Sequence, residues 1–279
     1  MSDLYAVFGN PIAHSKSPAI HAAFARVSGE QIVYEARLAA VDGFKSAISD
    51  FQLAGGKGAN VTVPFKEDAF RLCTRLSPRA ALAGAVNTLS FNAGEVAGDN
   101  TDGAGLVRDI EVNLGCSLAG KRILLLGAGG ASRGVIGPLL EGKPASLFIA
   151  NRSVEKAALL AQVFANVAEQ QNATVHAGKF EKTMGKSFDL VINATSASLS
   201  GQALALPAGL YAPGALAYDM MYGKGDTPFM AQARDQGAAI CSDGLGMLVE
   251  QAAEAFFVWR HVRPATQIVL SDLRRLIHT

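Results

Sequence analysis

One lysine and one aspartate have the residue types and neighbours expected of a proton-transfer site. Lys66 ends the segment Asn60-Val-Thr-Val-Pro-Phe-Lys66, and Asp102 ends the polar run Asp99-Asn-Thr-Asp102. A lysine amine serves as a general acid or base when partial burial brings its pKa toward working pH, and a nearby carboxylate would orient it. Two plainer interpretations stay open, a solvated lysine after a proline turn and an aspartate that caps the next helix.

Alternation along an extended chain would put the polar groups near Lys66 on one face. Asn60 and Thr62 then share a side with Lys66, while Val61 and Val63 point into the core. This arrangement predicts ligand-binding groups at the end of a strand, where α/β proteins usually bind their ligands. Further candidate polar side chains are Asn87, in an otherwise small and apolar loop, and the hydroxyls of Ser15 and Ser17. Ser17 followed by Pro18 also predicts an N-cap and a helix start.

A second motif predicts a phosphate-binding turn. The apolar run Ile123 to Leu126 is followed by Gly127-Ala-Gly-Gly-Ala131 and then by residues that can form a helix to Leu140. Glycines in such a turn let backbone N–H groups approach a pyrophosphate, and the helix N-terminus favours its negative charge. Ser132 occupies the third glycine position of the usual fingerprint, so the alternative is a tight turn that binds nothing.

The residues after the next strand distinguish the two nicotinamide cofactors. A carboxylate at that place binds the ribose hydroxyls of NAD, but this chain has Asn151-Arg152 instead. A guanidinium suits a 2′-phosphate, which favours NADP. Lys156, one helical turn later, would add a second positive charge. The alternative for Arg152 is an ordinary surface arginine.

Strands and helices are expected to alternate along most of the chain, which predicts an α/β protein with a parallel, doubly wound sheet in its middle part. Before this part we expect an α/β region with a hairpin turn at Asn92-Ala-Gly94 and a helix from Gly103 to Ile110 that crosses between domains. After it, a long amphipathic helix is expected from Leu245 to His261. The expected strands are 5–9, 32–38, 58–63, 88–91, 96–98, 123–126, 146–150, 174–176, 188–193, 215–219 and 238–241.

Composition excludes several classes of protein. The 279 residues allow one large or two ordinary domains, and a formal net charge of +1 argues against a nucleic-acid partner or a charge-bound membrane protein. No stretch is predicted to span a membrane or to act as a signal peptide, so a cytoplasmic location is expected. Three distant cysteines and five histidines show no zinc or disulfide spacing, so we expect no metal.

Taken together, these motifs resemble the shikimate dehydrogenase family over nearly the whole chain. The motifs that carry the resemblance come in the family's order: His14-Ser-Lys-Ser-Pro18, Asn60-Val-Thr-Val-Pro-Phe-Lys66, Gly84-Ala-Val-Asn-Thr88, Gly98-Asp-Asn-Thr-Asp102, Gly127-Ala-Gly-Gly-Ala131, Asn151-Arg152, Asn193-Ala-Thr-Ser196, Asp219-Met-Met-Tyr222 and Asp243-Gly-Leu-Gly-Met-Leu-Val-Glu-Gln251. Lys156 stands where many members have a second arginine.

The resemblance implies NADPH-dependent reduction of 3-dehydroshikimate to shikimate, with Lys66 as acid/base and Asp102 as its partner. It implies a substrate domain of residues 1–104 and 246–279, and a Rossmann-like NADP domain of residues 105–245. The implied substrate residues are Ser15, Ser17, Asn60, Thr62, Lys66, Asn87, Asp102, Tyr222 and Gln251. The implied cofactor residues are Gly127, Ala128, Gly129, Gly130, Ala131, Asn151, Arg152, Lys156, Thr195, Met220, Gly244 and Met247.

Two other functions remain compatible with these motifs. One is a quinate/shikimate dehydrogenase with broader substrate or NAD use, and the other is a non-catalytic NADP-binding regulator. If the protein is an enzyme, its expected partner is a small-molecule substrate. Both a monomer and a homodimer are compatible with the sequence.

Overall fold

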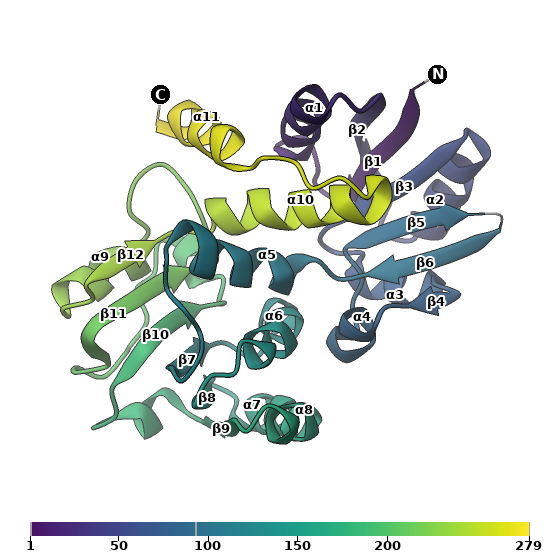
Figure 1. Ribbon diagram of the computed structural model, residues 1–279. Coiled ribbons are helices and arrows are strands. Elements are labelled where there is room, and N and C mark those ends of the chain that lie inside the picture. The colour runs from purple at the N-terminus through teal and green to yellow at the C-terminus, as the bar shows by residue number, and fades with distance from the viewer. Residues whose placement is uncertain (1, 93, 279) are drawn as a thin grey trace. The chain divides into compact units, whose positions relative to one another are not determined.

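The computed structural model describes residues 2–92 and 94–278, without the side chains of residues 199, 200 and 278. The chain divides into two compact units. The first comprises Met1–Gly105 and Val249–Asp272, and the second comprises Leu106–Leu248 and Leu273–Thr279. The divisions fall inside helices α5 (Asp102–Arg108), α10 (Leu245–Arg260) and α11 (Gln267–His278). Figure 1 labels these elements along the chain.

The first unit is built on a mixed six-stranded sheet in the order β2-β1-β3-β5-β6-β4. Strand β1 pairs in parallel with β2 and β3, whereas β5 runs antiparallel to both β3 and β6. The predicted hairpin is therefore present as β5 and β6, although Ala93 in its turn lies outside the described residues. The elements are β1 (Asp3–Gly9), α1 (Ser17–Ser28), β2 (Ile32–Leu38), α2 (Phe44–Leu53), β3 (Gly56–Val61), α3 (Lys66–Leu72), β4 (Arg75–Leu76), α4 (Pro78–Ala83), β5 (Thr88–Asn92) and β6 (Glu95–Asp99).

Two sequence predictions for the first unit are wrong. Ser17 is not the N-cap of α1 but its first residue, and Lys16 holds the cap position without a side-chain hydrogen bond. Val63 does not point into the core, because β3 ends at Val61 and the alternation of faces ends with it. The Val63 side chain is 67% exposed, while Val61 is buried. Lys66 accordingly begins helix α3 instead of ending a strand.

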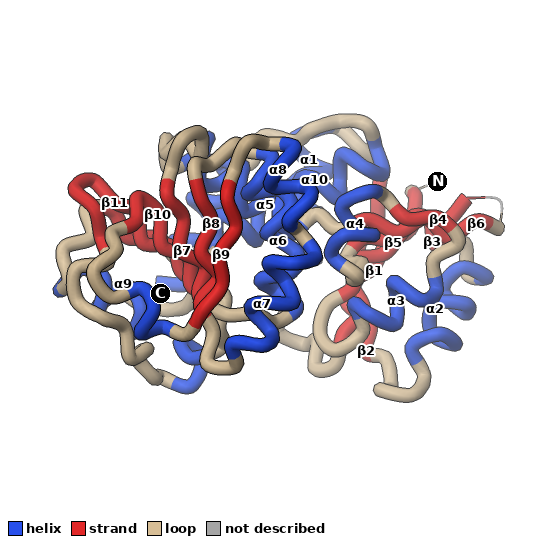
Figure 2. Tube along the Cα trace, turned by 90° about the horizontal axis from the view of Figure 1, so that it is seen from below, coloured by secondary structure: helices blue, strands red, loops and turns tan. Residues whose placement is uncertain are grey.

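The second unit contains a parallel sheet in the order β12-β11-β10-β7-β8-β9. Read from β9, this is the strand order 3-2-1-4-5-6 of a doubly wound dinucleotide-binding fold, which confirms the predicted fold class. Figure 2 shows α6, α7 and α8 on one face of the sheet and α9 on the other. The strands are β7 (Arg122–Leu126), β8 (Ser146–Ala150), β9 (Thr174–Gly178), β10 (Phe188–Asn193), β11 (Tyr211–Asp219) and β12 (Ile240–Ser242); the α-helices between them are α6 (Gly130–Glu141), α7 (Val154–Val163), α8 (Ala165–Gln170) and α9 (Pro228–Asp235).

Strand β7 lies at the centre of the second unit. Its residues Ile123 to Leu126 have no exposed surface, as expected of a strand covered by helices on both faces. Hydrogen-bonded neighbours β8 and β10 flank it. After β8, helix α7 ends at Val163, and α8 starts at Ala165 after the single residue Phe164.

An aromatic cluster holds α1 and α10 against the first sheet. The buried ring of His21, on α1, stacks on Tyr34 with ring centroids 4.1 Å apart and lies 5.5 Å from Trp259 of α10. Trp259 Nε1 donates a hydrogen bond of 3.0 Å to the Leu89 carbonyl oxygen. Burial lowers the pKa of His21 from 6.5 to about 3, so this ring stays neutral.

We predict that His21 makes the fold less stable in acid. Unfolded chains bind a proton at this ring below about pH 6.5, while the folded chain does not until about pH 3. The free energy of unfolding should therefore fall as pH drops through that window. In urea titrations, His21→Phe, which keeps an aromatic ring, should lose about 2 kcal/mol less than the parent chain between about pH 6.5 and pH 5. An equal loss in both proteins would contradict this role.

Candidate active site

Lys66 and Asp102 form an ion pair in the first unit. Lys66 Nζ lies 2.6 Å from Asp102 Oδ2, and the two side chains are 31% and 17% exposed. Lys66 begins α3 and Asp102 begins α5, so each residue is fixed at a helix start. An ammonium has three N–H donors. The pair is thus reachable from solvent, and the amine keeps donors for a ligand.

The side chain of Asn100, and not that of Asp102, bonds the backbone at the start of α5. The Asp102 backbone N–H donates to Asn100 Oδ1 at 3.2 Å, and Asn100 Nδ2 in turn donates to the Ala85 carbonyl oxygen at 3.0 Å. The side chain of Asn100, which is buried, therefore serves the start of α5. The interpretation of Asp102 as a simple helix cap is wrong, because its carboxylate bonds other side chains.

Asn87 connects the ion pair to the sheet. Its Oδ1 accepts the Thr101 backbone N–H at 2.8 Å, which fixes the orientation of the amide because a backbone N–H can only donate. Nδ2 then faces Asp102 Oδ1 at 2.8 Å. The Thr88 hydroxyl also donates to Asn87 Oδ1 at 2.9 Å. Asn87 is 2% exposed, so the Asp102 carboxylate is held by a rigid neighbour.

Gln251 reaches the same network from α10. Its Oε1 lies 3.3 Å from Asn87 Nδ2. The two helices can approach this closely because α5 has Gly105 at the contact. A Cβ at Gly105 would come within 2.5 Å of the Gln251 backbone nitrogen, a distance that no side chain tolerates. The glycine therefore brings Gln251 beside the ion pair.

Asn60 extends the network toward α1. Its Nδ2 donates to the Asn87 carbonyl oxygen at 3.1 Å, which leaves Oδ1 to accept the Tyr34 hydroxyl at 2.8 Å. Burial raises the pKa of Tyr34 well above its usual value, and the neighbouring Ser17 hydroxyl opposes that shift. Ser17 is buried, and its backbone N–H donates to Ser15 Oγ at 3.3 Å.

Of the predicted substrate residues in the first unit, the structure thus joins Lys66, Asp102, Asn87, Asn60 and Gln251. Thr62 lies just beyond β3, where its N–H donates to the Phe8 carbonyl oxygen at 2.9 Å. Tyr222 belongs to the second unit, where it follows β11 and burial raises its pKa.

The glycine turn of the second unit has room for a ligand. Gly127 has a φ of +108°, a conformation that favours glycine, and a Cβ there would come within 3.1 Å of Thr195 Cγ2. Gly129 and Gly130 face open space, since nothing lies within 4 Å of the Cβ position of either. The cap residue Gly129 offers no side chain to the first turn of α6. Backbone N–H donors at this helix start are therefore free of a side-chain cap.

Ser132 supports the interpretation of this turn as a phosphate cradle. Its side chain has no exposed surface, and its Oγ has no hydrogen-bond partner among the described residues. Buried hydroxyls are rarely left without a partner. The loop after β10 closes the other side, because the Ala194 carbonyl oxygen would lie 3.3 Å from a Cβ at Gly127. Strands β7 and β10 are the two at which the strand order reverses, where such folds bind dinucleotides. The residues at this turn fit the pyrophosphate of a dinucleotide.

Two polar residues that end neighbouring strands hold the loops around this turn. Asn193 and Asp219 are register partners on β10 and β11, and Asn193 Nδ2 donates to Asp219 Oδ1 at 3.0 Å. Asn193 Oδ1 accepts the N–H of Thr195, also at 3.0 Å. Asp219 Oδ2 accepts the hydroxyls of Ser198 and Thr227, each at 2.6 Å. Thr195 is thus held in place by Asn193, which Asp219 holds in turn.

The other predicted cofactor residues lie near the carboxyl ends of strands β8 and β11 or at the start of α10. Asn151 and Arg152 follow β8, and Asn151 Nδ2 donates to the Ser153 carbonyl oxygen at 2.9 Å. Arg152 and Lys156 are exposed. Met220 and Met247 are nearly buried, and a Cβ at Gly244 would lie only 2.2 Å from the Met220 carbonyl oxygen.

Reasoning from sequence missed three supporting residues of the first unit. Tyr34, Thr88 and Thr101 each bond Asn60 or Asn87. Thr88 and Thr101 stand inside two of the quoted motifs without an expected role, and Tyr34 stands in none of them. Thr101 gave the best available signal, because it lies inside the polar run that ends at Asp102.

Among the described residues, no three His, Cys, Asp or Glu side chains gather as metal ligands. In the same residues, no helix is long and apolar enough to cross a membrane.

Models of known protein families match three parts of the chain. Residues 7–89 match the model of the shikimate dehydrogenase substrate binding domain, residues 110–200 that of shikimate / quinate 5-dehydrogenase, and residues 244–273 that of the shikimate 5'-dehydrogenase C-terminal domain. A shikimate dehydrogenase (NADP(+)) of Dechloromonas aromatica is 72% identical, with 98% of each chain covered.

Solved structures show the same architecture. An Ael1 enzyme from Pseudomonas putida is 50% identical with a TM-score of 0.91, and 98% of each chain is covered. A Thermus thermophilus shikimate 5-dehydrogenase, solved in complex with NADP(H) and shikimate, is 32% identical with a TM-score of 0.85, covering 98% of this chain and 99% of that one. With its sequence motifs, its fold and these relatives in agreement, the chain belongs to the shikimate dehydrogenase family.

Proposed function

We propose that this protein catalyses the reversible, NADPH-dependent reduction of 3-dehydroshikimate to shikimate in aromatic amino acid biosynthesis. The observation that carries the proposal is the ion pair of Lys66 and Asp102, 2.6 Å apart within a network of buried amides. The name of the 72% identical relative supports the substrate and cofactor. A non-catalytic regulator would have no need of this pair.

Lys66 is the proposed acid/base. Bound NADPH supplies the hydride that reduces the carbonyl carbon. Lys66 donates a proton from its ammonium to the carbonyl oxygen, which becomes the hydroxyl, and in the reverse direction the neutral amine takes that proton back. Asp102 orients the amine and, through its partly exposed carboxylate, accepts a substrate hydroxyl. Held by Asn87, the carboxylate does not have to reorganise when charge moves.

The remaining polar residues of the first unit are proposed to bind the substrate through hydrogen bonds. The hydroxyls of Ser15 and Ser17 would bind the carboxylate. Asn60, Thr62, Asn87 and Gln251 would hydrogen-bond the ring hydroxyls, since sites built to pair each hydroxyl strongly reject analogues that lack one. Tyr222 stays a predicted contact to the carboxylate.

The second unit is the proposed NADP domain. Gly127 to Ala131 and the start of α6 would hold the pyrophosphate. Asn151, Arg152 and Lys156 would take the 2′-phosphate, and Thr195, Met220, Gly244 and Met247 would line the rest of the cofactor. The proposed domain boundaries follow the sequence prediction, 1–104 with 246–279 and 105–245. A cytoplasmic location and a monomeric or dimeric state stay predictions.

The direct test is a reaction of the protein with shikimate and NADP⁺, followed by the absorbance of the reduced nicotinamide. The expected result is turnover that is much faster with NADP⁺ than with NAD⁺ and much faster with shikimate than with quinate. Comparable rates with quinate or NAD⁺ would favour the broader enzyme. If no combination of substrate and cofactor gives turnover across a wide pH range, the result would favour the non-catalytic NADP-binding regulator.

We predict that Lys66→Ala abolishes proton transfer without affecting the cofactor. Its kcat should fall by about 10²–10⁴, the usual contribution of a positioned acid/base. NADP⁺ affinity, measured by calorimetry, should stay unchanged, because Lys66 lies in the first unit. Lys57→Ala, a substitution on β3 outside the network, is the matched control. Near-normal turnover of the Lys66 variant would refute the assigned role.

We also predict that Tyr34→Phe weakens substrate binding more than catalysis. The variant keeps the ring stacked on His21 but leaves Asn60 Oδ1 without its donor. Losing that bond should raise the KM for shikimate about fivefold to tenfold and change kcat much less. Tyr211→Phe is the control, since this hydroxyl has no hydrogen-bond partner among the described residues. Equal losses in both variants would show a general effect of removing a tyrosine hydroxyl.

A further inference from the structure

Strand β9 ends beside the residues proposed for the 2′-phosphate. It pairs with β8 in parallel, with Ala150 opposite Gly178. The next residue also pairs, because the Asn151 N–H donates to the Gly178 carbonyl oxygen at 3.0 Å. Neighbouring strands are about 4.8 Å apart, so Arg152 and Lys179 leave the same edge of the sheet side by side.

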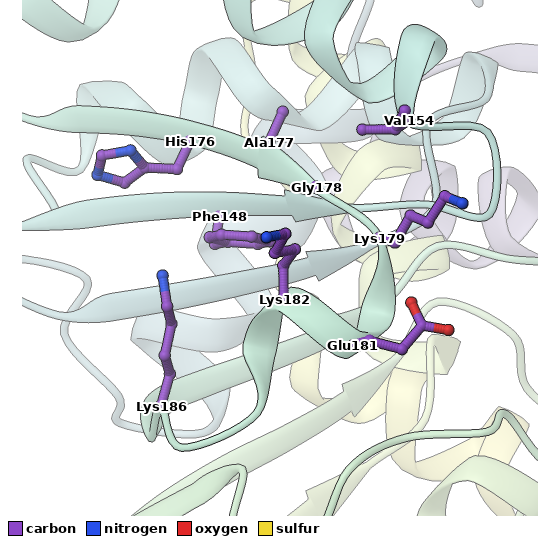
Figure 3. Close-up of a pocket in the computed structure, with 9 residues that line it drawn as sticks. All are labelled: Phe148, Val154, His176, Ala177, Gly178, Lys179, Glu181, Lys182 and Lys186. Carbon is purple, nitrogen blue, oxygen red and sulfur yellow. The ribbon is translucent and has the colours of Figure 1, made fainter.

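Lys179 lies toward the start of α7. It lines one cavity together with Val154, the first residue of that helix. Figure 3 shows both residues at the same end of this cavity, with His176 and Lys186 at the other end. Lys186 Nζ lies 4.8 Å from the centre of the Phe148 ring, so this lysine belongs to the face of the sheet. Lys179 instead follows the strand end and is exposed.

Glu155 shows that this place stabilises negative charge. Its pKa is lowered by a hydrogen bond from its own backbone N–H, then by the Ser153 hydroxyl and by the positive charge of Lys179. Ser153 Oγ donates to Glu155 Oε2 at 2.9 Å. A carboxylate of the chain itself is therefore hydrogen-bonded in the first turn of α7 and attracted by the positive charge of Lys179. An incoming anion would be stabilised there in the same way.

We propose that Lys179 is a further specificity residue for NADP, and that Glu155 opposes it. This inference rests on the proposed function, and it adds a cation from a second strand to Arg152 and Lys156. A phosphate monoester carries a charge of about −1.5 to −2 near neutral pH. Arg152, Lys156 and Lys179 outnumber the two carboxylates, Glu155 and the Glu181 that lines the same cavity as Lys179, so an excess of positive charge is left for it. The 2′-hydroxyl of NAD offers no charge to any of them.

The two residues should have opposite effects on one ligand. Lys179→Ala removes an attraction for the 2′-phosphate, and Glu155→Gln removes a repulsion and a competitor for the helix N-terminus. A purely structural ion pair between Lys179 and Glu155 would behave differently, because breaking it from either side would change NADP⁺ and NAD⁺ binding alike. The sign of the effect therefore separates the two explanations.

The experiment measures NADP⁺ and NAD⁺ affinity by calorimetry, without shikimate, for the parent chain and each variant. Lys179→Ala should weaken NADP⁺ binding about threefold to tenfold, as expected for one exposed charge pair with a dianion, and leave NAD⁺ binding unchanged. Glu155→Gln should strengthen NADP⁺ binding about twofold to fivefold, again without affecting NAD⁺. Lys182→Ala, which lines the same cavity from the short 3₁₀ helix after β9, is the matched control and should change neither.

Adenosine 2′,5′-bisphosphate and adenosine 5′-monophosphate, as competitors, test the same point, because they differ only in the 2′-phosphate. A Lys179 variant with unchanged NADP⁺ affinity, or with equal losses for NADP⁺ and NAD⁺, would overturn the proposal. So would a loss of equal size in the Lys182 variant. Calorimetry measures binding without any turnover. A failure of the shikimate reaction would therefore refute the proposed function, while the ratio of NADP⁺ to NAD⁺ affinity would still test the role of Lys179.

Discussion

The side-chain amide of Asn87 is the group on which the polar site of the first unit depends. It has one acceptor and two donor hydrogens, and the Thr101 backbone N–H takes the acceptor side. That bond turns the donors toward Asp102, which in turn holds Lys66. Because Asn87 is buried, an unpaired amide there would be costly. The orientation of the ion pair is thus set by the hydrogen bond from the backbone N–H of Thr101, in the segment that follows β6.

The second unit depends on a different constraint, the reversal of strand order at β7 and β10. Chains that leave these two parallel strands turn to opposite faces of the sheet, which leaves space beyond their carboxyl ends. Gly127 and the loop of Thr195 border that space. The buried pair of Asn193 and Asp219 keeps the loops of β10 and β11 in place. Burial raises the pKa of Asp219, while its hydrogen bonds to hydroxyls and amides oppose that shift.

Much of the fold could be predicted because the relevant signals are local. The apolar run of β7, the helix with Ile20 and Phe24 buried on one face, and Gly29 as its left-handed C-cap all follow from neighbouring residues. Predictions failed at the ends of elements, where a local pattern does not determine the exact boundary. Ser17 has the sequence signature of an N-cap, but the helix begins one residue earlier than that signature indicates. Val63 continues an apolar alternation, yet the strand has already ended.

The sequence by itself determined the chemistry available to this protein. The types and order of its motifs identify the amine, the carboxylate, the glycine turn and the arginine, since these depend only on which residues follow one another. Only the tertiary structure decided how they act together. Lys66 and Asp102 are separated by 36 positions, and Gln251 lies 164 positions beyond Asn87. Pairings over such distances depend on sheet register and on close helix contacts such as that at Gly105, and no local pattern encodes them.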